Sequence, residues 1–385
     1  MYSFPLRTPL LLLFIFYLNF LSRIVIAPLL PLVEVEFGLG HGAAGSIFLF
    51  IASGYCLGLF GSTFVSSHLN HRRTILLSSM LAGGIMLTVA RSASVSQMNG
   101  GLFLVGISTG LYLPSGIATL TDLIRTEHWG KAMGLHEMAP NLGFVTAPLL
   151  AESLLRLVSW RDVFGLLGLS MILMGILFLL LGPVVSHKGE PPSSRTMGKI
   201  VGNRSFWIMA AVFVLSIGAS LGVYAMLPLF LVSQIGFDRE LANTLVGLSR
   251  ISGLIMVFMA GLITDRIGPK RALVLFLTIT GTGTLMLGLV HGHIAISALV
   301  FLQATSVTCP FPAGLAMVSQ AFPSPLRSVA VSLLILIGFL LGGGGVPPLI
   351  GYFAEVFSFS FGFSLLGISI LALLPLFLTL RRPSH

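Results

Sequence analysis

The sequence is poor in charged residues, which make up only 9% of its 385 residues. Soluble globular proteins carry about 25% charged residues. The hydrophobic content of 55% and the mean hydropathy of +1.01 deviate in the same direction. The chain is therefore expected to be an integral membrane protein, and no polar segment is long enough to form a soluble domain.

The sequence also has few groups that could support covalent or metal chemistry. Its two cysteines, Cys56 and Cys309, both fall inside apolar stretches, which argues against a disulfide framework or a metal site. A phosphate-binding Gly-Lys-Ser/Thr loop is missing, which argues against ATP-driven transport. We expect neither an enzyme nor a protein that needs a cofactor.

Long aliphatic runs of roughly 20 residues, each matching one α-helical span, fill most of the chain. A polar stretch rich in Pro and Ser, "SHKGEPPSSRTMGKIVGNR" (186–204), separates two groups of six runs. The sequence predicts an all-α polytopic membrane protein with six-helix bundles at 1–185 and 205–385 and a cytoplasmic linker at 186–204. The twelve predicted spans are 10–33, 43–66, 74–92, 99–121, 131–153, 163–183, 205–232, 240–263, 270–290, 294–318, 327–353 and 359–380.

The basic residues predict the orientation of these spans. Two of the 21 lysines and arginines lie inside spans, and the others divide fifteen to four in favour of the side that carries both termini. The positive-inside rule makes that side cytoplasmic. The net charge of +9 thus reports topology in a cell membrane, where lipid headgroups are the partner, and does not indicate nucleic acid.

The two halves repeat each other at a period near 200 residues. A shift of 198 residues places "TFVSSHLNHRR" (63–73) on "GLITDRIGPKR" (261–271), so that Arg72-Arg73 matches Lys270-Arg271. A duplicated six-helix unit is typical of secondary transporters. Bends are predicted at "YLPSG" (112–116), at "TCPFPAG" (308–314) and in the glycine run of "GFLLGGGGVPP" (338–348).

The stretch "GLITDRIGPKR" resembles the loop signature of the major facilitator superfamily, and "RTEHWGKAMG", "NLGFVTAPLL" and "SWRDVF" are similar to other segments of that family. The resemblance covers the whole chain in span number, central linker and repeat. It implies a secondary transporter that works by alternating access. The first-half loop departs from the signature at Ser67, His68 and Asn70, which weakens the case for a charge relay there.

The intact second-half loop is predicted to act in gating. Asp265 at a helix end can accept hydrogen bonds from Arg266 or from the N-terminus of a neighbouring helix. Gly261 would permit close helix approach, and Gly268 a tight turn. The four residues could form a latch that holds one conformer, or the loop could be a solvated basic segment that only fixes topology.

Two arginines, Arg23 and Arg250, lie near the middle of spans, one in each half. A charge at that depth costs several kcal/mol unless it faces water or a partner. Only one acid, Glu137, lies clearly inside a span. We therefore expect the arginines to bind a small anionic substrate through bidentate contacts, with pairing to a buried acid as the alternative.

Polar side chains at helical spacing are candidates for the same cavity. Asn19 lies one turn before Arg23, and Tyr112, Tyr224 and Gln303 are the other candidate substrate-binding residues. Their Ser and Thr neighbours could equally serve helix packing. For proton coupling we favour Glu137, beside His136, and then Asp122, since burial lets a carboxylate titrate near neutrality. The alternative for Glu137 is a structural, hydrogen-bonded acid.

Together these features predict a monomeric secondary active transporter of a small organic anion, by symport or antiport, in an inner or plasma membrane. H⁺ is the candidate coupling ion. The alternative is a proton-driven exporter of amphipathic or cationic compounds, in which the arginines serve as gates.

Overall fold

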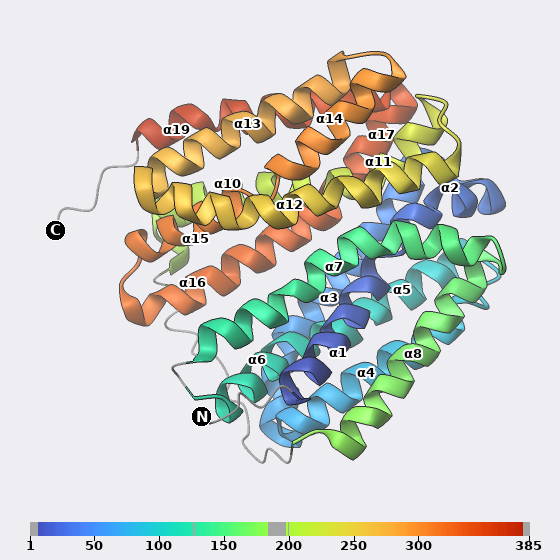
Figure 1. Cartoon of the computed structure of the whole chain (residues 1–385), viewed down its shortest axis with the longest axis vertical. Coiled ribbons are helices and arrows are strands. Elements are labelled where there is room, and N and C mark those ends of the chain that lie inside the picture. The colour runs from blue at the N-terminus through green and yellow to red at the C-terminus, as the bar shows by residue number, and fades with distance from the viewer. Residues whose placement is uncertain (1–6, 126–127, 184–197, 199, 380–385) are drawn as a thin grey trace. The chain divides into compact units, whose positions relative to one another are not determined.

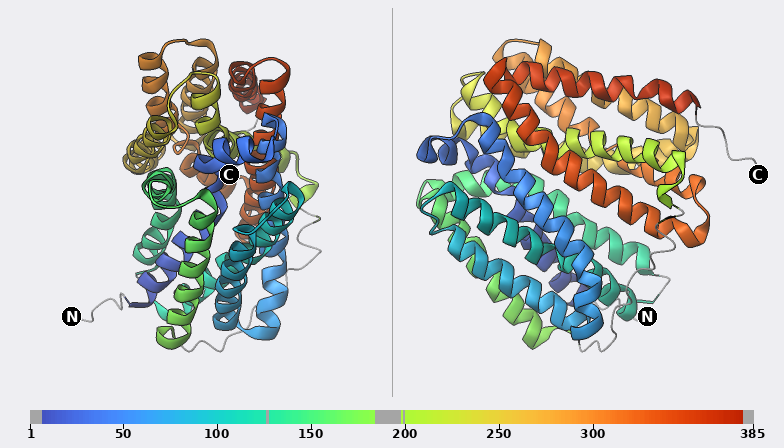
Figure 2. Two further views of the ribbon diagram at one scale, coloured as in Figure 1. Left: turned by 90° about the vertical axis from the view of Figure 1, so that its right-hand side faces the viewer. Right: turned by 180° about the vertical axis from the view of Figure 1, so that it is seen from behind.

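A computed structural model describes residues 7–125, 128–183, 198 and 200–379. All regular secondary structure in this part of the chain is helical, which confirms the predicted all-α polytopic fold (Figures 1 and 2). The first-half helices are α1 (Arg7–Ile24), α2 (Ile26–Phe37), α3 (His41–Leu69), α4 (His71–Val89), α5 (Val95–Gly110), α6 (Tyr112–Leu123), α7 (Trp129–Leu155) and α8 (Trp160–Leu181). The second half contains α10 (Arg204–Ile217), η2 (Gly218–Gly222), α11 (Val223–Ser233), α12 (Arg239–Ile267), α13 (Pro269–Leu289), α14 (His293–Ser306), α15 (Pro310–Ala321), α16 (Ser324–Ile337), η3 (Gly338–Gly345), α17 (Val346–Val356), α18 (Phe359–Ala372) and α19 (Leu374–Thr379).

Ten helical stretches of the described residues are long and apolar enough to cross a membrane, and they coincide with ten of the predicted spans. The other two predicted spans, 74–92 and 131–153, correspond to the helices α4 and α7. Side-chain capping interactions determine where several helices begin. In "SWRDVF", for example, the Ser159 side chain accepts from the Asp162 N–H while the Asp162 carboxylate accepts from the Ser159 N–H, which caps α8.

Several spans depart from regular α-helix in their middle. The first is interrupted at Val25, between α1 and α2, and the fourth at Leu111, where "YLPSG" begins. The tenth is interrupted between Ser306 and Pro310, in "TCPFPAG". The seventh and eleventh pass through π-helical turns, η2 and η3, and the glycine run of 338–345 forms η3. Each of the three predicted bends thus coincides with an interruption of regular α-helix or with a π-helical turn.

The chain divides into two compact units. Unit 1 contains Met1–Leu32 and Phe50–Pro192, and unit 2 contains Val33–Leu49 and Ser193–His385. Both units use a glycine pair to bring two helices into close backbone contact. A Cβ at Gly83 of α4 would meet the Gly168 carbonyl of α8 at 2.6 Å, and a Cβ at Gly367 of α18 would meet the Gly281 carbonyl of α13 at 2.8 Å. Since Gly281 follows Gly83 by 198 residues, the sequence repeat is also a repeat of packing.

Residues 33–49 pack within unit 2 although they are continuous with the first-half spans. His41 Nδ1 lies 2.7 Å from the Glu34 carboxylate, and the Gly42 N–H donates to Glu355 Oε1 over 2.9 Å. A Cβ at Gly42 would lie 3.5 Å from the Cα of Tyr352 on α17. The two contacts of Gly42 join the α2–α3 connection to α17.

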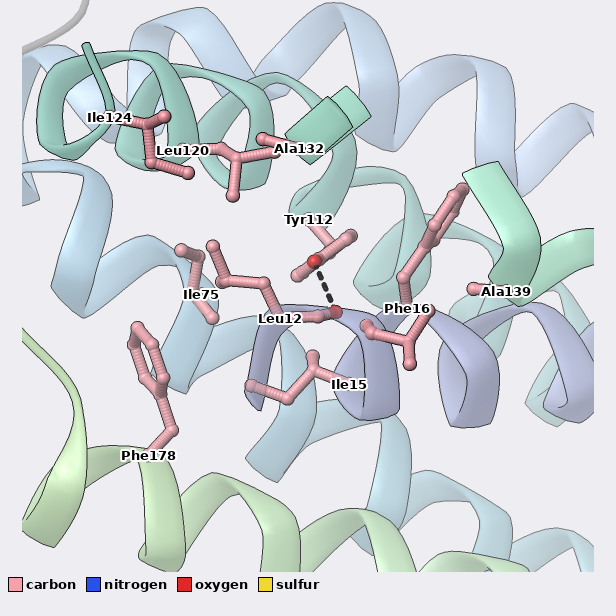
Figure 3. Close-up of a cluster of buried hydrophobic side chains, with 11 residues drawn as sticks. Leu12, Ile15, Phe16, Ile75, Tyr112, Leu120, Ile124, Ala132, Ala139 and Phe178 are labelled. Atoms are coloured by element: carbon pink, nitrogen blue, oxygen red, sulfur yellow. Dashed lines mark hydrogen bonds between the residues drawn. The ribbon is translucent and has the colours of Figure 1, made fainter. Parts of the chain in front are cut away.

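The core of unit 1 forms where α1 packs against α7, α8 and α6. It is built from aliphatic and aromatic side chains, and it also contains the phenol of Tyr112 (Figure 3). The core residues are Leu12, Leu13, Ile15, Phe16, Ile75, Tyr112, Leu120, Ile124, Ala132, Ala139 and Phe178. This cluster fixes α1, the helix that carries Arg23.

Candidate substrate-binding site

Arg23 lies in the last turn of α1, and only 7% of it is exposed. Its guanidinium carbon lies 3.9 Å from the centroid of the Tyr55 ring of α3 and 5.2 Å from that of Phe20. Its Nε donates to the Asn19 carbonyl at a long 3.4 Å. In the described residues no carboxylate forms an ion pair with it. Aromatic faces therefore hold this cation and leave its charge in place.

The side chain of Asn19 links α1 to α5. Its Nδ2 donates to the Thr109 carbonyl over 2.9 Å, just before the interruption at Leu111. The Asn19 Oδ1 is buried and accepts no hydrogen bond from the described residues. The amide thus ties the first span to the fourth and keeps one acceptor unused.

Unit 2 contains a similar arrangement around the π-helical turn η2. Arg250 of α12 is 5% exposed, its Nη2 donates to the Ser220 carbonyl over 3.0 Å, and its guanidinium lies 5.0 Å from the centroid of the Tyr224 ring. Gln303 of α14 donates to the Ala219 carbonyl over 2.8 Å. The Gln303 Oε1 is buried and accepts no hydrogen bond from the described residues. Both carbonyls belong to η2, which explains why they are available to side chains.

Both units contain an arginine that packs on a tyrosine ring, but the spans that carry the two residues are exchanged. In unit 1 the arginine is on the first span and the tyrosine on the second, whereas in unit 2 Tyr224 is on the seventh span and Arg250 on the eighth. The amide is likewise on the first span in unit 1 and on the tenth in unit 2. Sequence analysis missed Tyr55 because a single tyrosine in an apolar span gives no sign that an arginine of another span packs on its ring.

Tyr112 is another of the predicted substrate-binding residues. It is fully buried in the apolar core of unit 1, and its hydroxyl donates to the Leu12 carbonyl over 2.7 Å (Figure 3). Ser78 donates to the Ser108 carbonyl of the neighbouring helix, a contact that serves helix packing. Helical spacing places Tyr112 on one face of its span but does not distinguish a core position from a cavity position.

The acids proposed for proton coupling are both exposed. Asp122 at the end of α6 makes no hydrogen bond or ion pair with another described residue. The Glu137 side chain is 61% exposed, with Oε1 3.7 Å from Nδ1 of His136. We expected Glu137 to be buried, but the buried residue of this pair is His136, whose side chain is 1% exposed.

The predicted latch residues lie at the end of α12. Asp265 and Arg266 are exposed, and neither makes a hydrogen bond or ion pair with another described residue. Gly268 has a φ of 85°, a left-handed conformation that glycine adopts readily, and it forms the tight turn into α13. A Cβ at Gly261 would meet nothing within 4 Å, so close helix approach does not require glycine there.

Residues 12–287 and 236–385 match the family model of the Major Facilitator Superfamily, so the chain belongs to this superfamily of membrane transporters. The family and fold are those of a transporter and not of an enzyme. The chain is 20% identical to the probable nitrate transporter NarT of Staphylococcus haemolyticus over 86% of this chain and 85% of that protein. It is 21% identical to the probable sulfoacetate transporter SauU of Cupriavidus necator over 75% and 73% of the two chains.

Solved structures show the same fold. A bacterial homologue of the human lysosomal transporter Spinster, in an inward-facing and occupied conformation, has a TM-score of 0.76, with 18% identity over 98% of this chain and 95% of that one. A D-xylose–proton symporter has a TM-score of 0.79, with 15% identity over 97% of each chain.

Proposed function

We propose that this chain is a secondary active transporter that moves a small organic anion across the cell membrane by alternating access. The observation that carries the proposal is the buried guanidinium of Arg23, which lies in a membrane span without an ion pair to any described carboxylate. Such a charge is costly in a membrane unless a counter-charge reaches it. A negatively charged substrate supplies that counter-charge.

The second unit supports the same substrate class. Arg250 is also buried within a span, and both guanidinium groups rest on tyrosine rings, which orient them without cancelling their charge. Relatives named as transporters of nitrate, sulfoacetate and 4-methylmuconolactone fit this interpretation. In this proposal Arg23 and Arg250 bind the anion, while the Asn19 and Gln303 amides hold neighbouring spans together in each unit.

The proposal is tested by uptake into proteoliposomes that contain the purified protein. The panel comprises nitrate, sulfoacetate, small mono- and dicarboxylates, and the lipophilic cation tetraphenylphosphonium. We expect uptake of at least one anion, and we expect R23A and R250A to raise its KM by about 10- to 100-fold, since each removes a charged hydrogen-bond donor. R91A, which removes an exposed arginine, is the matched control.

Thermal unfolding of each variant separates loss of binding from loss of folding. Anions should raise the melting temperature of the wild type and of R91A but not of R23A, because only the folded state binds them. Transport of the cation alone, or equal anion uptake by R23A and R91A, would overturn the proposal and favour the exporter.

A further inference from the structure

His136 is a titratable group buried in the apolar core of unit 1. It lies on α7, and Phe16 of α1 stacks on its imidazole, with 4.4 Å between ring centroids and 13° between planes. The phenol of Tyr112 from α6 is also nearly parallel to it, at 5.9 Å. Three helices thus enclose a side chain that can change its charge near neutral pH.

The hydrogen bonds around Tyr112 fix the tautomer of this imidazole. The Tyr112 hydroxyl has a single proton, and it donates that proton to the Leu12 carbonyl. At 3.1 Å from His136 Nε2, the Tyr112 oxygen must therefore accept, so Nε2 carries a hydrogen. In the neutral ring Nδ1 then holds the lone pair.

Nδ1 is the unoccupied basic atom of this cluster. It is buried, it has no hydrogen-bond partner in the described residues, and it lies 3.7 Å from Oε1 of the exposed Glu137. The other groups that face the ring are the Phe16 ring and the Tyr112 hydroxyl. Glu137 is thus the one charged group among the described contacts of His136, and it reaches the surface.

We propose that His136 is the proton-binding site of this transporter, that the proton reaches Nδ1 by way of Glu137, and that its binding is linked to binding of the substrate anion. The lone pair of Nδ1 takes one proton and the ring becomes an imidazolium, which pairs with the Glu137 carboxylate. The proton is released from the same nitrogen when the ring returns to its neutral form.

The link to the substrate runs through α1. The Tyr112–Leu12 hydrogen bond attaches the cluster to α1, which also carries Arg23. Phe16, whose ring stacks on His136, lies on the same helix seven residues before Arg23. An anion bound at Arg23 adds negative charge to the unit that contains His136 and so favours the imidazolium, which predicts symport of anion and proton. This link rests on the proposed function, whereas the proton site itself does not.

Two transport measurements test the link, with the transported anion of the panel as the probe. The first is exchange of labelled anion at equal pH on both sides, and the second is uphill accumulation driven by an acid exterior. We expect the ratio of accumulation to exchange in H136Q to fall at least about tenfold below that of the wild type, because glutamine cannot take up a proton. H291Q, which removes an exposed histidine of unit 2, should keep the wild-type ratio. An unchanged ratio in H136Q overturns the link.

An NMR titration of histidine-labelled protein tests the proton site without transport. The signal that disappears in H136Q should change from the neutral form to the imidazolium form when the wild type is acidified, and the midpoint of this change should differ in E137Q because the partner of the imidazolium is lost. A His136 signal that stays neutral throughout, or an unchanged midpoint in E137Q, overturns the proton site. If the wild type exchanges no anion while His136 titrates, the proposed function fails and the proton site stands.

Discussion

Tyrosine rings allow two arginines to stay charged inside membrane spans. A guanidinium is planar and weakly hydrated, so an aromatic face replaces part of its hydration. Tyr55 offers that face at 3.9 Å and Tyr224 at 5.0 Å. A carboxylate at the same place would neutralise the arginine and leave nothing for a negative substrate to pair with. The type of residue that packs against the guanidinium therefore determines whether the positive charge remains available to bind an anion.

Two substitutions of Tyr55 distinguish the contribution of its ring from that of its hydroxyl. We expect Y55L to raise the KM for the anion and to lower stability by about 1–2 kcal/mol, because the cation–π contact is lost from a desolvated site. Y55F keeps the ring and should stay much closer to the wild type in both measurements. Uptake kinetics and thermal unfolding check this, and equal behaviour of Y55L and Y55F would contradict a role for the ring.

Interlocked glycines place Tyr55 relative to α1. Gly54 and Gly58 of α3 face Gly106 and Gly110 of α5, and at each of the four a Cβ would collide with backbone of the other helix. Tyr55 lies between the first two of these glycines, and its own backbone N would be 2.7 Å from a Cβ at Gly106. Small residues four positions apart allow this approach. The position of the ring under Arg23 therefore depends on the α3–α5 contact.

Alanine at Gly106 should separate α3 from α5. We expect G106A to cost about 1–3 kcal/mol of stability, because only backbone atoms could move to make room, and to weaken anion binding by displacing Tyr55. G100A on the same helix is the control, since a Cβ there meets nothing within 4 Å, and alanine should favour the helix by up to about 1 kcal/mol. Equal melting temperatures for the two variants would show that this contact does not stabilise the fold.

The α12–α13 turn should matter for conformational exchange and not for binding. Asp265 and Arg266 are exposed here without a hydrogen bond or ion pair to another described residue, as expected if their contacts form in another state of the cycle. We expect D265N to lower the maximal rate of uptake several-fold while the KM changes little, and D265E to recover most of the rate. An unchanged maximal rate in D265N would leave the loop a determinant of topology only.

At the scale of the whole molecule, the pattern of hydrophobic and polar residues in the sequence predicted the fold much better than the binding site. Hydrophobic runs and the period near 200 residues determine the helices and their duplication, because every span must satisfy its backbone internally. The site depends on contacts between distant residues, such as Arg23 with Tyr55 and Asn19 with Thr109, which no local pattern contains. Tyr112 and Glu137 show the limit: helical spacing predicts a face, whereas burial depends on which helix covers that face.

The packing of residues 33–49 within unit 2 has a consequence for transport. This segment is continuous with the first-half spans, yet Gly42 and His41 contact α17. If the halves rock against each other during alternating access, this segment has to leave α17 in part of the cycle. Fixing the contact covalently should then stop transport.

A disulfide between Gly42→Cys and Tyr352→Cys tests this directly. The two backbones approach closely, since a Cβ at Gly42 would lie 3.5 Å from the Tyr352 Cα, and the native Cys56 and Cys309 are buried. We expect the oxidised double variant to retain less than about a tenth of wild-type uptake and a reductant to restore it, because the bond prevents the exchange between conformers. Each single variant should transport in both redox states. Full uptake by the cross-linked protein would show that residues 33–49 stay on α17 throughout the cycle and that the moving boundary lies elsewhere in the chain.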